Sequence, residues 1–316
     1  MTGSPFGALA AALGLAAIAA GPAAAQQGPR TWVSGTGNDS AACSRQAPCR
    51  TLAVAYGHTS PYGEIDVVDS GAYGGLTITT PMTILGDGPG KTAISAAIIV
   101  NAPGQVVRIK GLEIDGMGTL ATGINVVSAS IVYLDDLQIT GLSGTGQGVL
   151  VQTVNQLYVT DTTISEAGGA GSLTGTGAGL AITAPGATTT AVALDHVKLL
   201  NGKTGLTVSV GASGTVNVAI TRSIIAGNTA AGVDATATAT GSTANVTLDR
   251  VTLVGNTPGG QVTGAGASIW LNGSLSTANS RTLLQTTNNV GATYSYGNND
   301  IDGNAALGTF VSAPLQ

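Results

Sequence analysis

The segments VVRIKGLEI (106–114), IVYLDDLQI (131–139) and QLYVTDTTI (156–164) decide the fold, because one pattern recurs in them at a step of about 25 residues. In each segment two aliphatic residues stand two positions apart, and a third follows five positions further on. Alternation with a period of two is typical of a β-strand that buries one face. The pattern continues, at similar or longer steps, in AVALDHVKL (191–199), VNVAITRSII (216–225) and NVTLDRVTL (245–253).

A second alternating element follows each of these strands. It reads TGINVVS (122–128) and QGVLVQT (147–153) in early repeats, and we align ASIWLNG (267–273) as its last member. The longer repeats carry SEAGGAGSLTGTG (165–177) and VGNTPGGQVTGAG (254–266). Because both are rich in Gly, we predict loops there, on the same side of the coils.

A step of about 25 residues with two or three short strands predicts a solenoid of parallel strands. The period of two excludes helical repeats, and a propeller blade needs about 40 residues. Equivalent side chains of successive coils should stack about 4.8 Å apart, so we expect the aliphatic anchors Ile109, Leu134 and Val159 to be neighbours. Neighbouring coils then supply the core that a single coil lacks.

The composition agrees with many short strands. The 316 residues include 48 Gly, 43% are hydrophobic and only 9% are charged. Disordered chains are charged and poor in apolar residues, so disorder is excluded. The net charge of −5 and the lack of a basic run argue against a nucleic-acid partner.

The first residues have the character of a secretory signal. An apolar, Ala-rich run ends in AAA before Gln26, so we predict a signal peptide over 1–25 and export to the periplasm, the medium or the cell surface. The alternative is a membrane anchor, but the run is shorter than the ~20 residues that a spanning helix needs. We expect no transmembrane segment after cleavage.

Cys43 and Cys49 are the only cysteines, and we expect a disulfide rather than a metal site shared with His58.

GDGPGKT (86–92) has the glycines and the Lys-Thr pair of a phosphate-binding loop. Such a loop needs four residues between its first Gly and the Gly-Lys pair, and the position that should be Gly is Leu85. No helix pattern follows, since AISAAIIV (93–100) alternates like a strand. We predict a turn after a strand and no nucleotide partner.

The repeats resemble the secreted bacterial right-handed parallel β-helix proteins of the pectate-lyase-like superfold. GEIDVVDSGAYGGLTITTPMTILGDG (63–88) resembles their opening strands, and SYGNNDIDGN (295–304) resembles their closing coil. The resemblance implies an all-β, right-handed parallel β-helix of about eight or nine coils. It implies a single domain over 26–316, with an N-terminal cap at 26–60 and coils at 61–310.

A short capping helix belongs to the same resemblance. APCRTLAVAYGHT (47–59) has Pro48 where a first helical turn tolerates it, and Leu52, Ala55 and Tyr56 would form the apolar face. Such a helix would cover the open end of the solenoid.

A column of charged residues stands two positions after the anchors. If the coils are in register, Asp136 and Asp161 lie about 5 Å apart, close enough to bind Ca²⁺ or to share acid-base work. A corner between strands faces solvent, however, and alternating acids and bases there form a solvated ladder worth roughly 0–1 kcal/mol per pair. We favour the ladder. The column comprises Asp136, Asp161, His196, Arg222 and Arg250.

The resemblance places catalysis on the face formed by the second element. By our alignment its outward side chains include one ionisable group, Asp234, whereas a glycoside hydrolase needs two carboxylates. We therefore predict no catalytic residue, no metal and no cofactor. The side chains that we expect to meet a ligand, with Trp270 stacking on a sugar ring, are Asn125, Gln152, Asp234, Trp270 and Asn272.

We thus expect an exported, monomeric β-helix protein with a non-catalytic role, binding polysaccharide or associating with the cell surface. The alternative that the resemblance leaves open is a polysaccharide lyase or glycoside hydrolase.

Overall fold

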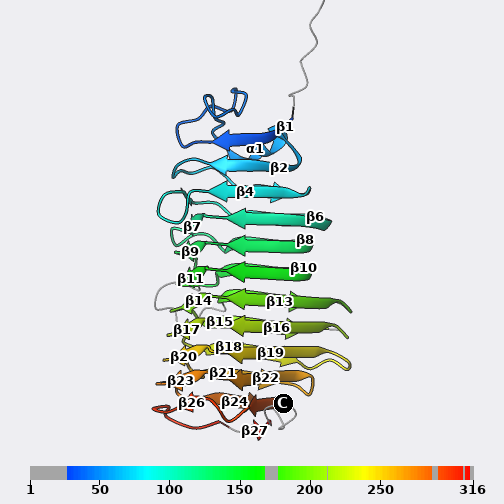
Figure 1. Cartoon of the computed structure of the whole chain (residues 1–316), viewed down its shortest axis with the longest axis vertical. Helices are drawn as coiled ribbons and strands as arrows, with labels where there is room; N and C mark the ends of the chain where they lie inside the picture. The colour runs from blue at the N-terminus through cyan, green and yellow to red at the C-terminus, as the bar shows by residue number, and fades with distance from the viewer. Residues whose placement is uncertain (1–26, 168–176, 212, 287–290, 309, 314–316) are drawn as a thin grey trace, which may run out of the picture.

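The computed structural model describes residues 27–167, 177–211, 213–286, 291–308 and 310–313. Within these ranges the chain is an all-β parallel β-helix of about eight coils with one helix, which confirms the predicted right-handed parallel β-helix. Each coil passes through three faces, and the coils stack along one axis (Figure 1). The predicted signal peptide lies outside the described residues, as does most of the predicted loop at 165–177.

The strands that carry the aliphatic anchors form the face that we call the anchor face, which is turned to the viewer in Figure 1. Three long strands bend, so that their second halves belong to this face: β6 (Ile98–Lys110), β8 (Thr122–Asp135) and β10 (Gln147–Thr160). The other members are β1 (Gly28–Val33), β2 (Thr59–Val67), β4 (Met82–Gly86), β13 (Thr189–Asp195), β16 (Thr215–Thr221), β19 (Thr243–Asp249), β22 (Ala267–Asn272), β25 (Ala292–Ser295) and β27 (Val311–Ser312).

Two more faces complete each coil. The second face contains the first halves of β6, β8 and β10 together with β3 (Leu76–Ile78), β12 (Ala178–Ala184), β15 (Thr204–Val210), β18 (Ala231–Ala237), β21 (Gly260–Thr263) and β24 (Leu283–Thr286). The short-strand face contains β5 (Ala93–Ile94), β7 (Glu113–Asp115), β9 (Gln138–Thr140), β11 (Thr163–Ser165), β14 (Lys198–Leu200), β17 (Ile224–Ala226), β20 (Thr252–Val254), β23 (Leu275–Thr277) and β26 (Asp300–Ile301).

The aliphatic anchors stack as predicted. Ile109 pairs with Leu134, Leu134 with Val159, and Val159 with Leu194, all in parallel register. Each of these four side chains is at most 1% exposed. Burying an aliphatic side chain of this size contributes about 1.5–3 kcal/mol, so every coil depends on its neighbours for most of its stability.

The corner that follows the anchor strands from β6 to β19 has a left-handed backbone. Among non-glycine residues this conformation is uncommon and marks a tight turn. Each corner N–H donates to a carbonyl oxygen of the next coil, as Asp136 N does to Thr160 O (3.1 Å). The structure thus confirms a tight corner at the charged column, whose members Asp136, Asp161, His196, Arg222 and Arg250 have φ angles of 52°, 47°, 53°, 48° and 54°.

Buried asparagines line the corner between the short-strand face and the second face. Asn228, Asn256 and Asn279 are 1% exposed, and Asn304 continues the column. Asn228 Nδ2 donates to Asn256 Oδ1 (2.9 Å), and Asn256 Nδ2 donates to Asn279 Oδ1 (3.0 Å). We call these four residues the Asn ladder, and it ties the coils of the C-terminal half together.

The predicted capping helix is α1 (Leu52–His58), which begins after the N-cap residue Thr51. Thr51 Oγ1 accepts a hydrogen bond from Val54 N (3.3 Å), the usual way to satisfy a free N–H at a helix start. Leu52 and Ala55 are buried as predicted, and Tyr56 packs against the core partly buried.

Cys43 and Cys49 form the predicted disulfide, with their Cα atoms 4.6 Å apart. Both cysteines are fully buried, and Cys49 N donates to Trp32 O (2.9 Å) beside β1. The chain at Cys49 is extended, because it pairs with β1, and the helix begins only at Leu52. Pro48 therefore precedes the helix. The prediction that Pro48 stands in the first helical turn is therefore wrong.

The alignment of 267–273 with the second face is also wrong. β22 pairs with β19, so that Ile269 lies beside Val246 and Trp270 beside Thr247 on the anchor face. The second face continues instead through β21, inside the segment 254–266 that we expected to be a loop. The order of the three faces is unchanged, and the alignment was wrong because β21 is a strand of only four residues in a Gly-rich segment.

GDGPGKT (86–92) is a turn, as predicted. β4 ends at Gly86, Gly88 and Gly90 have φ angles of 107° and 83°, and Lys91 N donates to Gly88 O (3.1 Å). The strand β5 follows directly.

Within the described parts of the chain, no helix has the length and apolarity that a membrane crossing requires.

Candidate functional site

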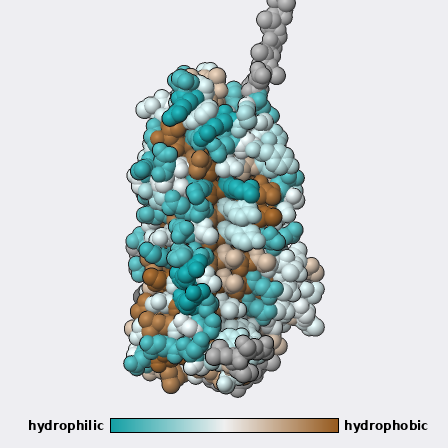
Figure 2. Space-filling model, viewed as in Figure 1, coloured by the Kyte–Doolittle hydropathy of each residue, from teal (hydrophilic) through white to brown (hydrophobic). Residues whose placement is uncertain are grey.

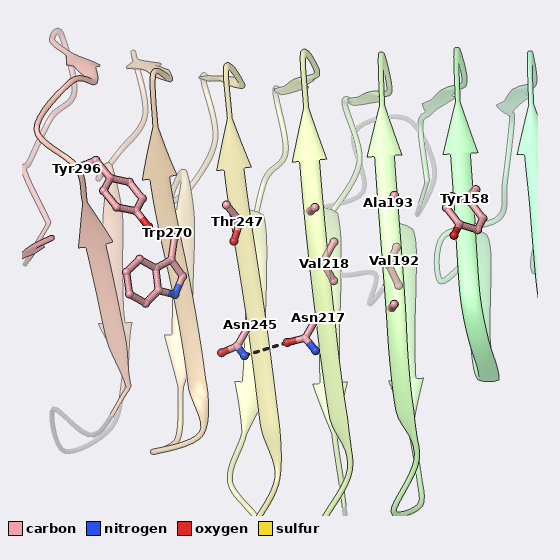
Figure 3. A pocket seen from close by; sticks show the side chains of 11 residues that line it. Tyr158, Val192, Ala193, Asn217, Val218, Asn245, Thr247, Trp270 and Tyr296 are labelled. Carbon is pink, nitrogen blue, oxygen red and sulfur yellow. Dashed lines mark hydrogen bonds between the residues drawn. The ribbon is translucent and has the colours of Figure 1, made fainter. Parts of the chain in front are cut away.

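A groove of about 580 Å³ lies on the anchor face and crosses β13, β16, β19 and β22 (Figure 3). Its volume falls in the range typical of ligand-binding sites. Figure 2 shows apolar and weakly polar surface along the middle of this face, bordered by hydrophilic side chains. The groove is lined by Tyr158, Ala191, Val192, Ala193, Asn217, Val218, Ala219, Asn245, Thr247, Trp270 and Tyr296.

The groove exists because one outward column changes from large to small side chains and back. This column holds the residue directly before each anchor, and its three middle members are Ala193, Ala219 and Thr247. Aromatic residues bound this floor at both ends, Tyr158 towards the N-terminus and Trp270 towards the C-terminus. Four strand spacings of about 4.8 Å separate them, so the floor is about 19 Å long.

The C-terminal end of the groove is an aromatic cluster. The Trp270 indole stacks on Tyr294, with ring centroids 3.8 Å apart and planes 14° apart. Tyr296 also belongs to the cluster, with its ring centroid 5.9 Å from that of Trp270 and its plane tilted by 33°. Since Tyr294 covers one face of the indole, the other face is left to the groove that Trp270 lines.

The N-terminal end is a second stack. Tyr133 and Tyr158 lie parallel, with centroids 5.0 Å apart, and the Arg108 guanidinium lies 4.6 Å from the Tyr133 centroid. A smaller pocket of about 360 Å³ begins beyond Tyr158 and includes Arg108 and Lys110. Tyr158 therefore separates the groove from a more charged region of the same face.

A polar network forms one wall of the groove. Trp270 Nε1 donates to Ser268 Oγ (3.1 Å), and Ser268 Oγ donates to Asn245 Oδ1 (2.8 Å). Asn245 Nδ2 in turn donates to Asn217 Oδ1 (3.0 Å), the bond drawn in Figure 3. The two donors that cross between coils, Ser268 Oγ and Asn245 Nδ2, both bond to the preceding coil, so the Asn217 amide N–H groups stand at the N-terminal end of the network.

Carboxylates along the opposite edge are already paired with arginines. Asp195 accepts from Arg222 Nε (3.0 Å) and from Thr221 Oγ1 (2.6 Å), and Asp249 accepts from Arg250 Nε (3.0 Å). The hydrogen bond from Arg222 is the main cause that lowers the pKa of Asp195 to about 2. Asp195 therefore stays ionised at physiological pH, so it is a poor proton donor.

The charged corner column runs beside these acids. His196 Nδ1 lies 3.3 Å from Asp195 Oδ2, and half of the His196 side chain is exposed. Lys110 pairs with Asp135, which also accepts from Thr160 Oγ1 (2.6 Å). Burial opposes ionisation of Asp135, but its hydrogen bonds to Lys110 and Thr160 outweigh this effect and lower its pKa. The basic members of the column thus pair with the acids one position before it, Asp195 and Asp249, in partly exposed ion pairs. Among the described residues, Asp136 and Asp161 make no ion pair.

The predicted binding residues do not form one site. Asn125 and Gln152 meet on the second face, where Gln152 Nε2 donates to Asn125 Oδ1 (3.2 Å). Asp234 stands on the same face four coils away from Asn125, and its desolvation raises the pKa of its carboxyl group. Trp270 and Asn272 lie on the anchor face, and of the five predicted residues only Trp270 lines the groove.

Sequence reasoning missed Tyr158, Asn217, Asn245 and Tyr296. The available signal was the triplet of aliphatic, aromatic and aliphatic residues in VYL (132–134), LYV (157–159) and IWL (269–271). These triplets all lie on anchor strands and place their aromatic residue in the same outward column. Aligning IWL with the other two would have placed Trp270 correctly.

No family model matches the chain, and no curated protein matches its sequence. Among solved structures it is similar to the alginate lyase from Paenibacillus sp. str. FPU-7, with 15% identity and a TM-score of 0.54 over 90% of this chain and 100% of that chain. It is also similar to pectate lyase Pel9A, with 13% identity and a TM-score of 0.50 over 90% and 78% of the two chains. The comparisons therefore agree with the structure that the chain has a parallel β-helix fold.

Proposed function

We propose that the chain is an exported polysaccharide-binding protein, and that an extended glycan lies in the groove along the helix axis. The observation that carries this proposal is the pair of aromatic boundaries, Tyr158 and Trp270, at the ends of a straight floor of small residues. The two similar structures are an alginate lyase and a pectate lyase, and both alginate and pectate are polysaccharides.

The chemistry of the groove suits sugar rings. An exposed indole face packs against the apolar face of a pyranose ring, as aromatic side chains do at binding surfaces. The wall formed by Asn217 and Asn245 offers amide donors and acceptors to hydroxyl groups. Because the groove is open to solvent along its length, a glycan can enter it from the side, between Tyr158 and Trp270. The disulfide between Cys43 and Cys49 fits the oxidising compartment that export implies.

Binding can be measured by affinity electrophoresis and isothermal titration calorimetry with a panel of soluble glycans. At least one glycan should bind, and Trp270→Ala should weaken that binding at least tenfold, which corresponds to about 1.4 kcal/mol. The matched control is Tyr62→Ala, because Tyr62 is an exposed aromatic residue far from the groove. If no glycan binds, or if both variants weaken binding equally, the groove is not a glycan site.

A second candidate is a polysaccharide lyase or glycoside hydrolase. The observation in its favour is that Asp195, His196 and Arg222 stand together at the groove edge. It predicts new reducing ends from polyuronides or neutral glycans, and loss of that turnover when Asp195 and His196 are changed together. Product formation by the unaltered protein would replace the binding proposal with this one.

A further inference from the structure

We infer that the groove selects neutral, hydroxyl-rich glycans and discriminates against polyuronates. The inference rests on the proposed function, and it names the ligand class of the same groove. The inferred ligand class differs from the polyuronates alginate and pectate, on which the two similar proteins act as lyases.

The groove lining provides no charge for a ligand carboxylate. Its eleven residues carry amide, hydroxyl, aliphatic and aromatic side chains, and neither Lys nor Arg is among them. A site that binds a carboxylated chain pairs those carboxylates with cations, most often with bidentate Arg. A neutral sugar needs only the donors and acceptors of hydroxyl groups, which Asn217, Asn245 and Thr247 supply.

The cations next to the groove are already engaged. Arg222 contacts Asp195 through both Nε and Nη2, and Arg250 contacts Asp249 through Nε and Nη2. A uronate in the groove would have to compete with these acids for their partners. It would also lie beside Asp195 and Asp249, whose negative charges oppose its approach.

A cation without an ion-pair partner lies outside the groove. Over the ranges that the structure describes, Arg108 makes no ion pair, and its guanidinium rests on the Tyr133 ring. The Tyr133 and Tyr158 stack separates it from the groove floor. A carboxylated chain would therefore find its charge partner beyond Tyr158, while the floor from Ala193 to Thr247 remains neutral.

The test compares hexasaccharides that share a backbone and differ at C6. β-1,4-Mannohexaose is compared with β-1,4-hexamannuronate, and α-1,4-galactohexaose is compared with α-1,4-hexagalacturonate. Binding is measured by calorimetry at two salt concentrations. The neutral member of at least one pair should bind at least tenfold more tightly, with little dependence on salt. Equal or tighter binding of the uronates overturns the inference and leaves the proposed function standing. If none of the neutral or acidic glycans binds, the proposed function itself is overturned.

An added charge gives an independent readout. Ala219 is exposed in the middle of the floor, so Ala219→Lys should raise uronate affinity at least fivefold without a gain for the neutral hexamer. Thr207→Lys, on the second face, is the control and should change neither affinity. Circular dichroism and the melting temperature confirm that both variants fold. Unchanged uronate binding by folded Ala219→Lys would show that charge in the groove does not set the preference.

Discussion

The Asn ladder allows a stability prediction that follows directly from its hydrogen bonds. Asn256 Oδ1 accepts from Asn228 N (3.1 Å) and from Asn228 Nδ2 (2.9 Å). Asn256 Nδ2 donates to Ile225 O (2.9 Å) and to Asn279 Oδ1 (3.0 Å). Asn256→Ala removes all four bonds from a corner where the side chain is 1% exposed.

The expected loss follows from the groups that remain without a partner. Asn228 N, one N–H of Asn228 Nδ2 and Ile225 O lose their bonds to Asn256. Asn228 Nδ2 keeps its other bond, to Leu199 O (3.3 Å), and Asn279 Oδ1 keeps its bond from Asn256 N (2.8 Å). A buried polar group left unsatisfied costs about 1–3 kcal/mol. A water molecule in the vacated space can serve two of the three groups. One group then remains unsatisfied, so the free energy of unfolding should fall by about 1–3 kcal/mol.

Equilibrium unfolding in urea measures this loss, and hydrogen exchange shows where the coils open. The matched control is Asn155→Ala, an exposed asparagine, which should change the free energy of unfolding by less than about 0.5 kcal/mol. Amides of β17, β20 and β23 should exchange faster in Asn256→Ala, while those of β6 and β8 keep their protection. A loss below about 1 kcal/mol would refute the view that this ladder holds the coils together.

Three further predictions concern titration and the cap. Burial raises the folded-state pKa of Asp234, so the contribution of Asp234 to the free energy of unfolding declines as pH rises above the unfolded pKa of about 3.9. Asp234→Asn should abolish this decline and raise the melting temperature at pH 7. Arg222→Ala should return the Asp195 pKa from about 2 towards its ordinary value, visible by NMR. Because both partners are partly exposed, the loss of stability at neutral pH should be small, and the difference from the unaltered protein should vanish as pH falls through about 2. Cys43→Ser with Cys49→Ser should lower the free energy of unfolding by about 2 kcal/mol, and an unchanged urea midpoint would contradict the role of this bridge.

The architecture could be predicted because buried positions repeat. Ile109, Leu134 and Val159 recur at a step of about 25 residues, and a period of two together with this step permits one arrangement of strands. The same alternation occurs on the anchor face and on the second face, so a strand's face must be inferred from its order along the chain. That inference was wrong at Trp270, because β21 is short and lies in a Gly-rich segment that reads as a loop.

The groove could not be predicted from the repeat, because its residues point outward. Ala193, Ala219 and Thr247 look ordinary one at a time, and they form a floor only when the register stacks them between Tyr158 and Trp270. The polar wall is equally dispersed, since Asn217 and Asn245 are 28 residues apart along the chain. The chemistry of this face therefore depends on the register between coils and not on any local motif.

The Asn ladder and the groove occupy the same part of the solenoid. Asn228, Asn256 and Asn279 follow the strands β17, β20 and β23, and the anchor strands of those three coils are β16, β19 and β22. The side chains of Asn217, Asn245 and Trp270 project from those anchor strands (Figure 3). A buried, fully bonded ladder holds successive coils at a constant spacing, and a groove whose wall is one amide per coil requires that spacing. Asn256→Ala should therefore weaken glycan binding even though Asn256 lies on a different corner, whereas the exposed Asn155→Ala should leave binding unchanged.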